Sequence, residues 1–230
     1  MVGQLPVDLR QARPDFWVSN VHKWLYVHRG AAILYVAKRH QHLMHSIPIG
    51  QYYDNARKAS RDGCPAWTDE FAWNGTLDFS PVLSIESALE FRDKVCGGDE
   101  RIQAYCHKLA KEGGELVARE LGTSVMQTAD PASDGELIAN MVNVELPMSF
   151  PLKPNAQSDL TMAQRISKTV SVLSGELLSR HSTFALCYAH NDRWWARLSA
   201  QIYLDLDDFA YGAKALKDVC SRLESGELAV

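Results

Sequence analysis

The sequence predicts an α/β protein made of two regions. Residues 1–80 carry short apolar runs of strand length, typical of the end of an α/β sheet. Residues 81–230 alternate helical periodicity with strand-length runs, which is the pattern of an α+β domain whose strands pack against helices. A length of 230 residues allows one or two domains, at roughly 150 residues for each. We therefore expect domains at 1–80 and 81–230.

The first region begins with an expected strand, polar turn and second strand. One short apolar run ends at residues 18–20, and residues 31–37 (AAILYVA) form a compact apolar run. Residues 38–66 are polar and contain glycine and proline, so we expect a long, partly irregular surface stretch. Such a length without regular structure is uncommon in a compact domain and is often functional.

A first helix is expected from Ser84, which suits an N-cap, to Gly97 and Gly98, which suit a helix end. Its expected apolar face consists of Ala88, Leu89 and Phe91. A second helix is expected from Asp99 to Gly122, and it continues past a pair of adjacent glycines at positions 113 and 114. Its expected apolar stripe contains Ile102, Tyr105, Cys106, Leu109 and Ala110.

The remaining chain is expected to alternate strands, loops and helices. In order, the expected elements are a loop at 123–137, a strand at 138–146, a loop at 148–158, a helix at 161–179, paired strands at 183–189 and 195–203, and a helix from 205–208 onward. Acidic residues at the start of this last helix favour its N-terminus.

Composition excludes several classes of protein. With 24 Lys+Arg against 28 Asp+Glu, the chain has no basic surplus for nucleic acid. The apolar run Gly30–Ala37 is far below the ~20 residues that span a bilayer, so no membrane association is expected. We also expect no signal peptide. The five cysteines are scattered and none forms CxxC, which favours a reducing, cytoplasmic setting over a disulfide framework.

One cluster suggests metal binding. His40, His42 and His45 form HxHxxH. We interpret it as a polar surface loop and expect no metal, because no helix sets the spacing and no carboxylate follows closely. The motifs GxGxxG, GxxxxGK[ST], GxSxG and HExxH are absent.

Lys23 is the candidate nucleophile. It lies among apolar and aromatic residues between the two expected strands. Desolvation and nearby positive charge can lower the pKa of a lysine in such a place, and the neutral amine can form a Schiff base with a carbonyl cofactor. The neighbouring His22 can donate to a phosphate. An ordinary surface lysine at a strand end remains the alternative, and spacing alone favours it.

An ordered set of motifs adds to this interpretation. Asn20-Val21-His22-Lys23-Trp24 is followed by Arg29-Gly30 and an apolar strand, and the later segments Trp73–Asp78, Val142–Pro147 and Arg197–Tyr203 follow in order. Together they resemble class V (fold type I) PLP-dependent enzymes. The resemblance is to the isopenicillin-N-epimerase-like branch and, within it, to the fungal hercynylcysteine sulfoxide lyases of ergothioneine biosynthesis.

The resemblance implies roles for individual residues. Lys23 matches the lysine that binds pyridoxal 5'-phosphate and moves the substrate α-proton. His22 and Asn20 match positions that contact the cofactor phosphate. Gly75 and Thr76 match a loop that reaches the phosphate of the neighbouring subunit, although a simple turn explains this pair equally well. A homodimer with shared active sites is therefore implied.

Arg197 matches the arginine that binds the substrate α-carboxylate, and a surface arginine at a strand edge is the alternative. The family's aspartate toward the pyridine nitrogen and its glycine-rich phosphate segment have no counterpart here. We therefore expect the chain to correspond to the C-terminal portion of such an enzyme. His28 also departs from the proline usual in the family.

The expected function is C–S lyase chemistry on a cysteine-derived sulfoxide, a small-molecule amino-acid substrate. Amino-acid epimerisation and cysteine desulfhydration by the same site remain open, because they share the first proton transfer. A persulfide-forming desulfurase is less favoured, since no cysteine occupies a recognisable catalytic loop, although Cys64 lies in the irregular stretch. A non-catalytic fragment or pseudoenzyme is the alternative of a different class, and the missing aspartate favours it.

Overall fold

The computed structural model describes residues 2–47, 49–53, 66–73, 75–128, 135–152 and 160–228. The chain divides into two compact units, Met1–Asp99 and Glu100–Val230. We call them unit 1 and unit 2. The domain boundary near residue 80 that the sequence predicts stays a prediction.

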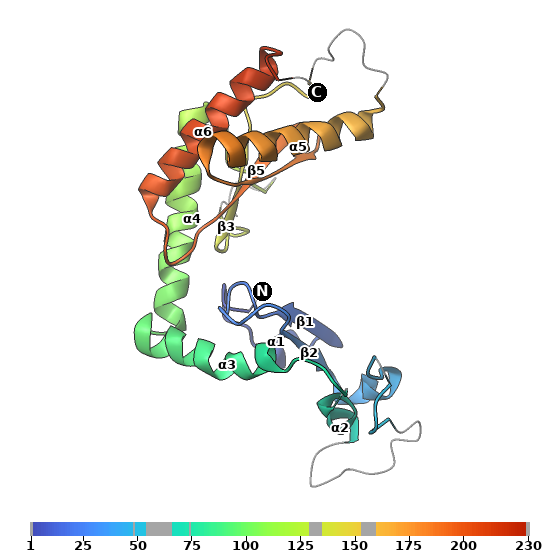
Figure 1. The fold of residues 1–230 in the computed structure, drawn as a ribbon. Helices are drawn as coiled ribbons and strands as arrows, with labels where there is room; N and C mark the ends of the chain where they lie inside the picture. Colours follow the sequence, from blue (N-terminus) through green and yellow to red (C-terminus); the bar gives the residue numbers. More distant parts are fainter. Residues whose placement is uncertain are drawn as a thin grey trace. The chain divides into compact units, whose positions relative to one another are not determined.

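Unit 1 contains an antiparallel pair of strands, β1 (Phe16–Asn20) and β2 (Ala32–Val36) (Figure 1). Phe16 lies opposite Val36, and Asn20 lies opposite Ala32. The predicted order of strand, turn and strand is confirmed. The register brings the two ends of the intervening segment, residues 21–31, close together.

Three short helices of unit 1 were not predicted. They are α1 (Leu9–Ala12), the 3-10 helix η1 (Lys38–Leu43) and α2 (Ala66–Ala72). Helix α1 is capped by Asp8, whose Oδ1 accepts hydrogen bonds from the backbone N–H groups of Arg10 and Gln11. The expectation of an irregular stretch after residue 37 is thus wrong at its start. Such short helices lack the length over which periodicity can be recognised.

Helix α3 (Ser80–Glu90) begins before the predicted Ser84 and continues into the π-helix η2 (Phe91–Val95). Its earlier start has two causes: Asp78 Oδ1 accepts the N–H of Ser80 at 2.9 Å, and Pro81 suits the first turn. Hydrogen bonds from Ser80 hold the pKa of the Asp78 carboxyl below its usual value.

The predicted apolar face of α3 is partly wrong. Leu89 and Phe91 are exposed, whereas Ala88 and Arg92 are buried. Ile85, Ala88 and Arg92 follow the helical spacing i, i+3, i+7 and therefore share one face. A charged residue thus occupies a core-facing position.

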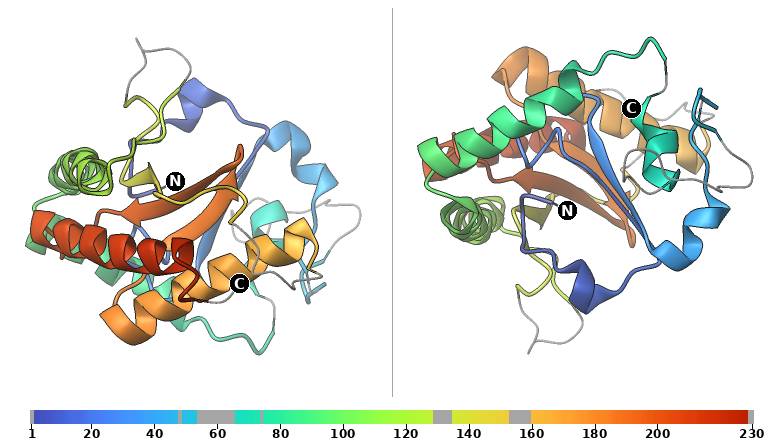
Figure 2. Two further views of the ribbon diagram at one scale, coloured as in Figure 1. Left: turned by 90° about the horizontal axis from the view of Figure 1, so that it is seen from above. Right: turned by 90° about the horizontal axis from the view of Figure 1, so that it is seen from below.

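Unit 2 combines three helices with a three-stranded antiparallel sheet (Figures 1 and 2). Its elements are α4 (Asp99–Leu121), β3 (Met141–Glu145), α5 (Met162–His181), β4 (Leu186–His190), β5 (Arg193–Ser199) and α6 (Leu206–Glu224). The strand order is β3-β5-β4, so β5 is central. This confirms every helix and strand expected after residue 99, with shifted ends.

Local sequence explains where these elements begin and turn. Thr161 caps α5 through a capping box with Gln164, and Asp205 does the same for α6 with Asp208. Strands β4 and β5 are joined by Asn191 and Asp192, both with positive φ, as a two-residue hairpin requires.

The sheet of unit 2 has one buried face and one more open face, although Trp195 on the second face is also buried. Trp194 and Ala196 of β5 are buried together with Val142 and Val144 of β3. In Figure 2 the helices α5 and α6 lie on the same side of strands β4 and β5. Residues that alternate with the buried set therefore point to the open face. Within the described residues, no helix is long and apolar enough to cross a membrane.

Burial makes two cysteines of unit 2, Cys187 and Cys220, poor nucleophiles. It raises the pKa of the Cys187 thiol to about 12 and raises that of Cys220 as well. The thiolate is the reactive form, so at pH 8 we expect iodoacetamide to modify the half-buried Cys96 in the native chain and to leave Cys187 and Cys220 unmodified. Peptide mass spectrometry with and without urea measures this. Native-state modification of Cys187 at the rate of Cys96 would contradict it. The predicted candidate Cys64 lies outside the described residues.

Candidate cofactor and substrate sites

Lys23 lies on the turn between β1 and β2. Its side chain is exposed, while its neighbours Val21, Trp24 and Leu25 are buried. The apolar setting expected from the sequence therefore surrounds the backbone of the turn and leaves the amine accessible. No hydrogen bond or ion pair of the described residues engages Lys23. The amine is free to meet a ligand.

Apolar packing gives this turn a defined shape. Val21, Leu25, Val27 and Ala31 form a buried cluster with Ala88 of α3. The backbone closes the segment as well, because Val21 N–H donates to Ala31 and Val27 N–H donates to Val21. The turn is thus built from core residues on both sides of Lys23.

Arg92 also contacts this turn. Its guanidinium is buried and donates to the carbonyl of Trp24 at 2.7 Å and to Asp99 Oδ1 at 2.7 Å. It lies 4.8 Å from the centre of the Tyr26 ring. The carbonyl that it binds belongs to the residue directly after Lys23.

Gly3 packs closely against the same carbonyl. A Cβ at position 3 would lie 2.3 Å from Trp24 O, and the φ of Gly3 is +87°. Both facts require glycine here. The segment before α1 therefore packs directly on the backbone of the Lys23 turn.

His22 directly precedes Lys23 in the turn, and Asn20 ends strand β1 three residues before Lys23. His22 Nδ1 is 3.1 Å from the carbonyl oxygen of Ala31 and donates to it, which leaves Nε2 for a ligand. Asn20 Oδ1 is buried and has no hydrogen-bond partner among the described residues. Such an atom in a folded protein calls for a ligand or water at that place.

Gly75 and Thr76 are found elsewhere in unit 1. Gly75 has a φ of +84°, and a Cβ there would meet nothing within 4 Å, so the backbone conformation alone favours glycine. Thr76 is exposed. No hydrogen bond of the described residues joins either of them to the Lys23 turn, and their role toward a neighbouring subunit stays a prediction.

Arg197 lies on the open face of the unit 2 sheet, in the central strand β5. It is exposed, and it lies opposite Asn143 of β3 and Leu186 of β4. Among the described residues no carboxylate pairs with it, unlike Arg193 of the same strand, which pairs with Glu145 at 3.1 Å. Its guanidinium is therefore available to an anionic ligand.

Two polar residues flank Arg197 on this face. The Tyr188 hydroxyl donates to Asn143 Oδ1 at 2.9 Å, which turns the amide nitrogen of Asn143 away from the phenol. Burial raises the pKa of Tyr188, and the positive charge of Arg197 opposes this shift. The phenol thus stays a donor and holds the Asn143 amide beside the arginine.

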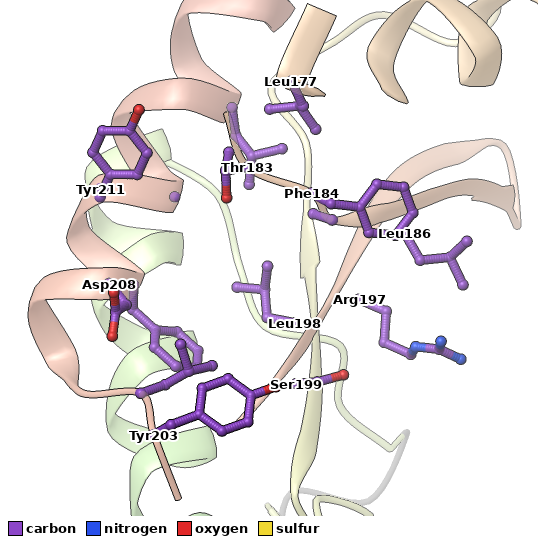
Figure 3. Close-up of a pocket in the computed structure, with 15 residues that line it drawn as sticks. Leu177, Thr183, Phe184, Leu186, Arg197, Leu198, Ser199, Tyr203, Asp208 and Tyr211 are labelled. Atoms are coloured by element: carbon purple, nitrogen blue, oxygen red, sulfur yellow. The ribbon is translucent and has the colours of Figure 1, made fainter. Parts of the chain in front are cut away.

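A pocket of about 390 Å³ lies where β5 ends and α6 begins. Its wall is mostly apolar, with hydroxyls from Tyr203 and Tyr211 and the carboxylate of Asp208. Figure 3 shows that Arg197 projects away from Asp208 and Tyr211 and occupies one edge of the pocket. Phe184 and Leu186 lie on the side of the strands toward which Arg197 projects (Figure 3).

The histidine cluster does not assemble as a metal site. His40 pairs with Asp15 at 3.0 Å, whereas His45 pairs with the buried Glu70 at 2.9 Å. The two rings are therefore directed to different carboxylates. In the described ranges, no three His, Cys, Asp or Glu residues gather closely enough to hold a metal ion.

Sequence reasoning missed Arg92, Asn143 and Tyr188. An arginine at a core-facing position of a helix was the available signal for Arg92. For Asn143 and Tyr188 the sequence offers no comparable signal, because the hydrogen bond between their side chains depends on strand register.

The fold is shared with a solved structure. A cysteine desulfurase from Thermococcus onnurineus NA1 superposes with a TM-score of 0.60 over 95% of this chain and 50% of that chain, at 15% identity. No protein-family model matches the chain.

Two curated relatives make the assignment specific. The L-cysteine desulfhydrase-like protein lolT1 of Epichloe uncinata is 34% identical over 99% of this chain and 54% of its own length. The hercynylcysteine sulfoxide lyase of Schizosaccharomyces pombe is 31% identical over 96% of this chain and 50% of its own. The chain belongs to the class V, fold type I family of PLP-dependent enzymes. It spans about half the length of the curated relatives it matches.

The residues of unit 1 fit the family's cofactor. Pyridoxal phosphate needs an accessible primary amine for its aldehyde and donors for its phosphate. Lys23 supplies an exposed amine for the aldehyde. Nδ1 of His22 already donates to Ala31, so Nε2 donates to a phosphate in the imidazolium form. The unsatisfied Oδ1 of Asn20 is an acceptor, so this side chain contacts a phosphate only through its amide Nδ2. With these donors the segment suits this cofactor.

Proposed function

We propose that this chain is part of a PLP-dependent C–S lyase that acts on a cysteine-derived substrate. A cysteine sulfoxide of the hercynylcysteine type and L-cysteine itself are the two substrates that the relatives support equally. The observation that carries the proposal is the exposed Lys23 beside His22 and Asn20, on a turn held by core packing.

In this proposal His22 and Asn20 would hold the phosphate of pyridoxal phosphate, and Lys23 would hold its aldehyde. When bound, this cofactor supplies an electron sink for negative charge at the substrate α-carbon. The Lys23 amine is the group that accepts the α-proton at Nζ.

Unit 2 supplies recognition of the substrate carboxylate. Arg197 offers a planar pair of donors suited to a carboxylate, and the Asn143 amide, oriented by Tyr188, offers a further N–H. For a sulfoxide substrate, cleavage of the Cβ–S bond releases a sulfenic acid. Hydrolysis of the remaining three-carbon fragment gives pyruvate and ammonia. For L-cysteine the sulfur leaves as hydrogen sulfide.

The first test is a visible spectrum of the chain with added pyridoxal phosphate, followed by borohydride reduction and peptide mass mapping. A stable absorption band with label on Lys23 supports the proposal. Pyruvate release from L-cysteine and from an S-substituted cysteine sulfoxide then separates the two substrates. Absence of a band, or label spread evenly over surface lysines, would instead support a non-catalytic fragment.

We expect Arg197→Lys to lose preference for substrates that carry a carboxylate. Lysine keeps the positive charge but cannot donate two parallel hydrogen bonds to one carboxylate. A charge-assisted hydrogen bond contributes about 1.5–3 kcal/mol. The preference for L-cysteine over cysteamine, measured as the spectral response of the cofactor-loaded chain, should fall roughly 10–100-fold. Arg193→Lys is the matched control, since Arg193 lies on the same strand and pairs with Glu145. An unchanged preference in Arg197→Lys would contradict the assignment.

We also propose a homodimer in which Gly75 and Thr76 of one subunit contact the phosphate bound by the other. Sedimentation analysis with and without pyridoxal phosphate tests the assembly. A monomer at every concentration would refute this part of the proposal.

A further inference from the structure

Arg92 is a buried cation of unit 1 that is both paired and hydrogen-bonded. Its side chain is about 2% exposed, and Asp99 supplies the opposite charge at 2.7 Å. The remaining donors are directed to backbone carbonyls, namely Trp24 O at 2.7 Å and Gly3 O at 3.5 Å. A buried charge is tolerated only when it is paired and hydrogen-bonded, and Arg92 meets this condition.

One of the two carbonyls that Arg92 binds belongs to a residue next to Lys23 in the sequence. Trp24 follows Lys23 directly, so the bond from Arg92 sets the orientation of a peptide group one residue from the amine-bearing residue. Tyr26, two residues further on, has a positive φ of 66°, and its ring lies 4.8 Å from the guanidinium carbon. Arg92 thus holds the turn on the C-terminal side of Lys23.

The other interactions act on different parts of the turn. Apolar packing of Val21 and Leu25 buries the turn without directing its peptide groups, because hydrophobic burial is non-directional. His22 is bonded to Ala31 on the N-terminal side. A directional bond next to Lys23 on the C-terminal side comes from Arg92.

We propose that Arg92 is a positioning residue that sets the place of the Lys23 amine relative to the phosphate contacts His22 and Asn20. This inference rests on the proposed function, since it assumes that these three residues receive one cofactor. In pyridoxal phosphate the aldehyde and the short phosphate arm are on adjacent ring carbons, which limits the distance between them. A displaced amine therefore meets the aldehyde less readily while His22 and Asn20 hold the phosphate. Errors of about 1 Å in such arrangements can reduce reaction about 100-fold.

The test compares pyridoxal phosphate with pyridoxal, which has the aldehyde but no phosphate. Each is incubated with the full chain and trapped with borohydride, and label on Lys23 is normalised to the exposed Lys168 and Lys214. The variants are Arg92→Lys, which keeps charge without the planar fork, and Asp99→Asn, which removes the counter-charge. Glu90→Gln is the control, because it breaks the exposed pair of Glu90 with Lys94 on the neighbouring turn.

We expect the native chain and Glu90→Gln to label Lys23 preferentially with pyridoxal phosphate. Arg92→Lys should lower the ratio of pyridoxal phosphate to pyridoxal label at Lys23 by at least about tenfold, with pyridoxal labelling unchanged. A role limited to overall stability would leave this ratio unaltered in the folded fraction. Asp99→Asn should lower the ratio to a smaller extent.

Two outcomes overturn different statements. If the native chain shows the preference and folded Arg92→Lys keeps it, the role of Arg92 is refuted and the proposed function stands. If the native chain shows no preference for the phosphate ester at Lys23, the proposed function fails, and the role of Arg92 fails with it. Circular dichroism establishes folding, and if Arg92→Lys does not fold, the ratio in Asp99→Asn decides.

Discussion

Lys23→Arg should abolish the borohydride-trapped label of pyridoxal phosphate at position 23. Arginine keeps the positive charge that attracts a phosphate, but its guanidinium stays protonated and does not attack an aldehyde. His22 and Asn20 remain in place, so weak non-covalent binding of the phosphate should persist. The expected result is loss of the absorption band and of the labelled peptide, with residual label only on surface lysines.

Lys38→Arg is the matched control for this change. Lys38 is an exposed lysine of unit 1 at the start of η1, and its replacement should leave the band and the labelled peptide intact. A band that persists in Lys23→Arg, or that disappears in Lys38→Arg, would show that the cofactor amine lies elsewhere.

Gly113→Ala should destabilise unit 2, although alanine is the better helix former. In the interior of a helix, alanine is favoured over glycine by about 1 kcal/mol. A Cβ at position 113, however, would lie 2.3 Å, 2.6 Å and 2.7 Å from three ring atoms of Phe209 on α6. The Phe209 ring is buried, so it cannot move aside without displacing the core. Overpacking of this kind costs about 1–3 kcal/mol, and urea denaturation should show a lower free energy of unfolding.

Gly175→Ala is a control that should change the free energy of unfolding in the opposite direction. Gly175 lies inside α5, and a Cβ there would meet nothing within 4 Å. This substitution should raise the free energy of unfolding by up to about 1 kcal/mol, since only the helix propensity changes. Equal effects of the two substitutions would contradict the close contact of α4 with α6.

Elements with a clear local signal were predicted well. The hairpin around Lys23 was predicted because two apolar runs flank a polar segment. The start of α5 was predicted near Thr161 and that of α6 near the acidic residues from Asp205, and the structure shows a side-chain cap at both positions. The early start of α3 was missed because Asp78 and Pro81 act before the first apolar residue of the helix.

The site residues that were predicted from the sequence also lie in segments with a clear local signal. A sequence motif predicted a role for Lys23 and for Asn20 and His22, because all three lie in one contiguous segment. A second contiguous segment predicted a role for Arg197, and these roles stay predictions. These assignments needed no long-range contact.

By itself, the sequence determined the family, the lysine turn and the two-region order of strands and helices, since each depends on residues that are neighbours along the chain. Only the tertiary structure decided that Arg92 is buried against the carbonyl of Trp24, and that Tyr188 orients Asn143 beside Arg197. These contacts join residues far apart in sequence. Their formation depends on helix packing and strand register, which no local pattern of residues encodes.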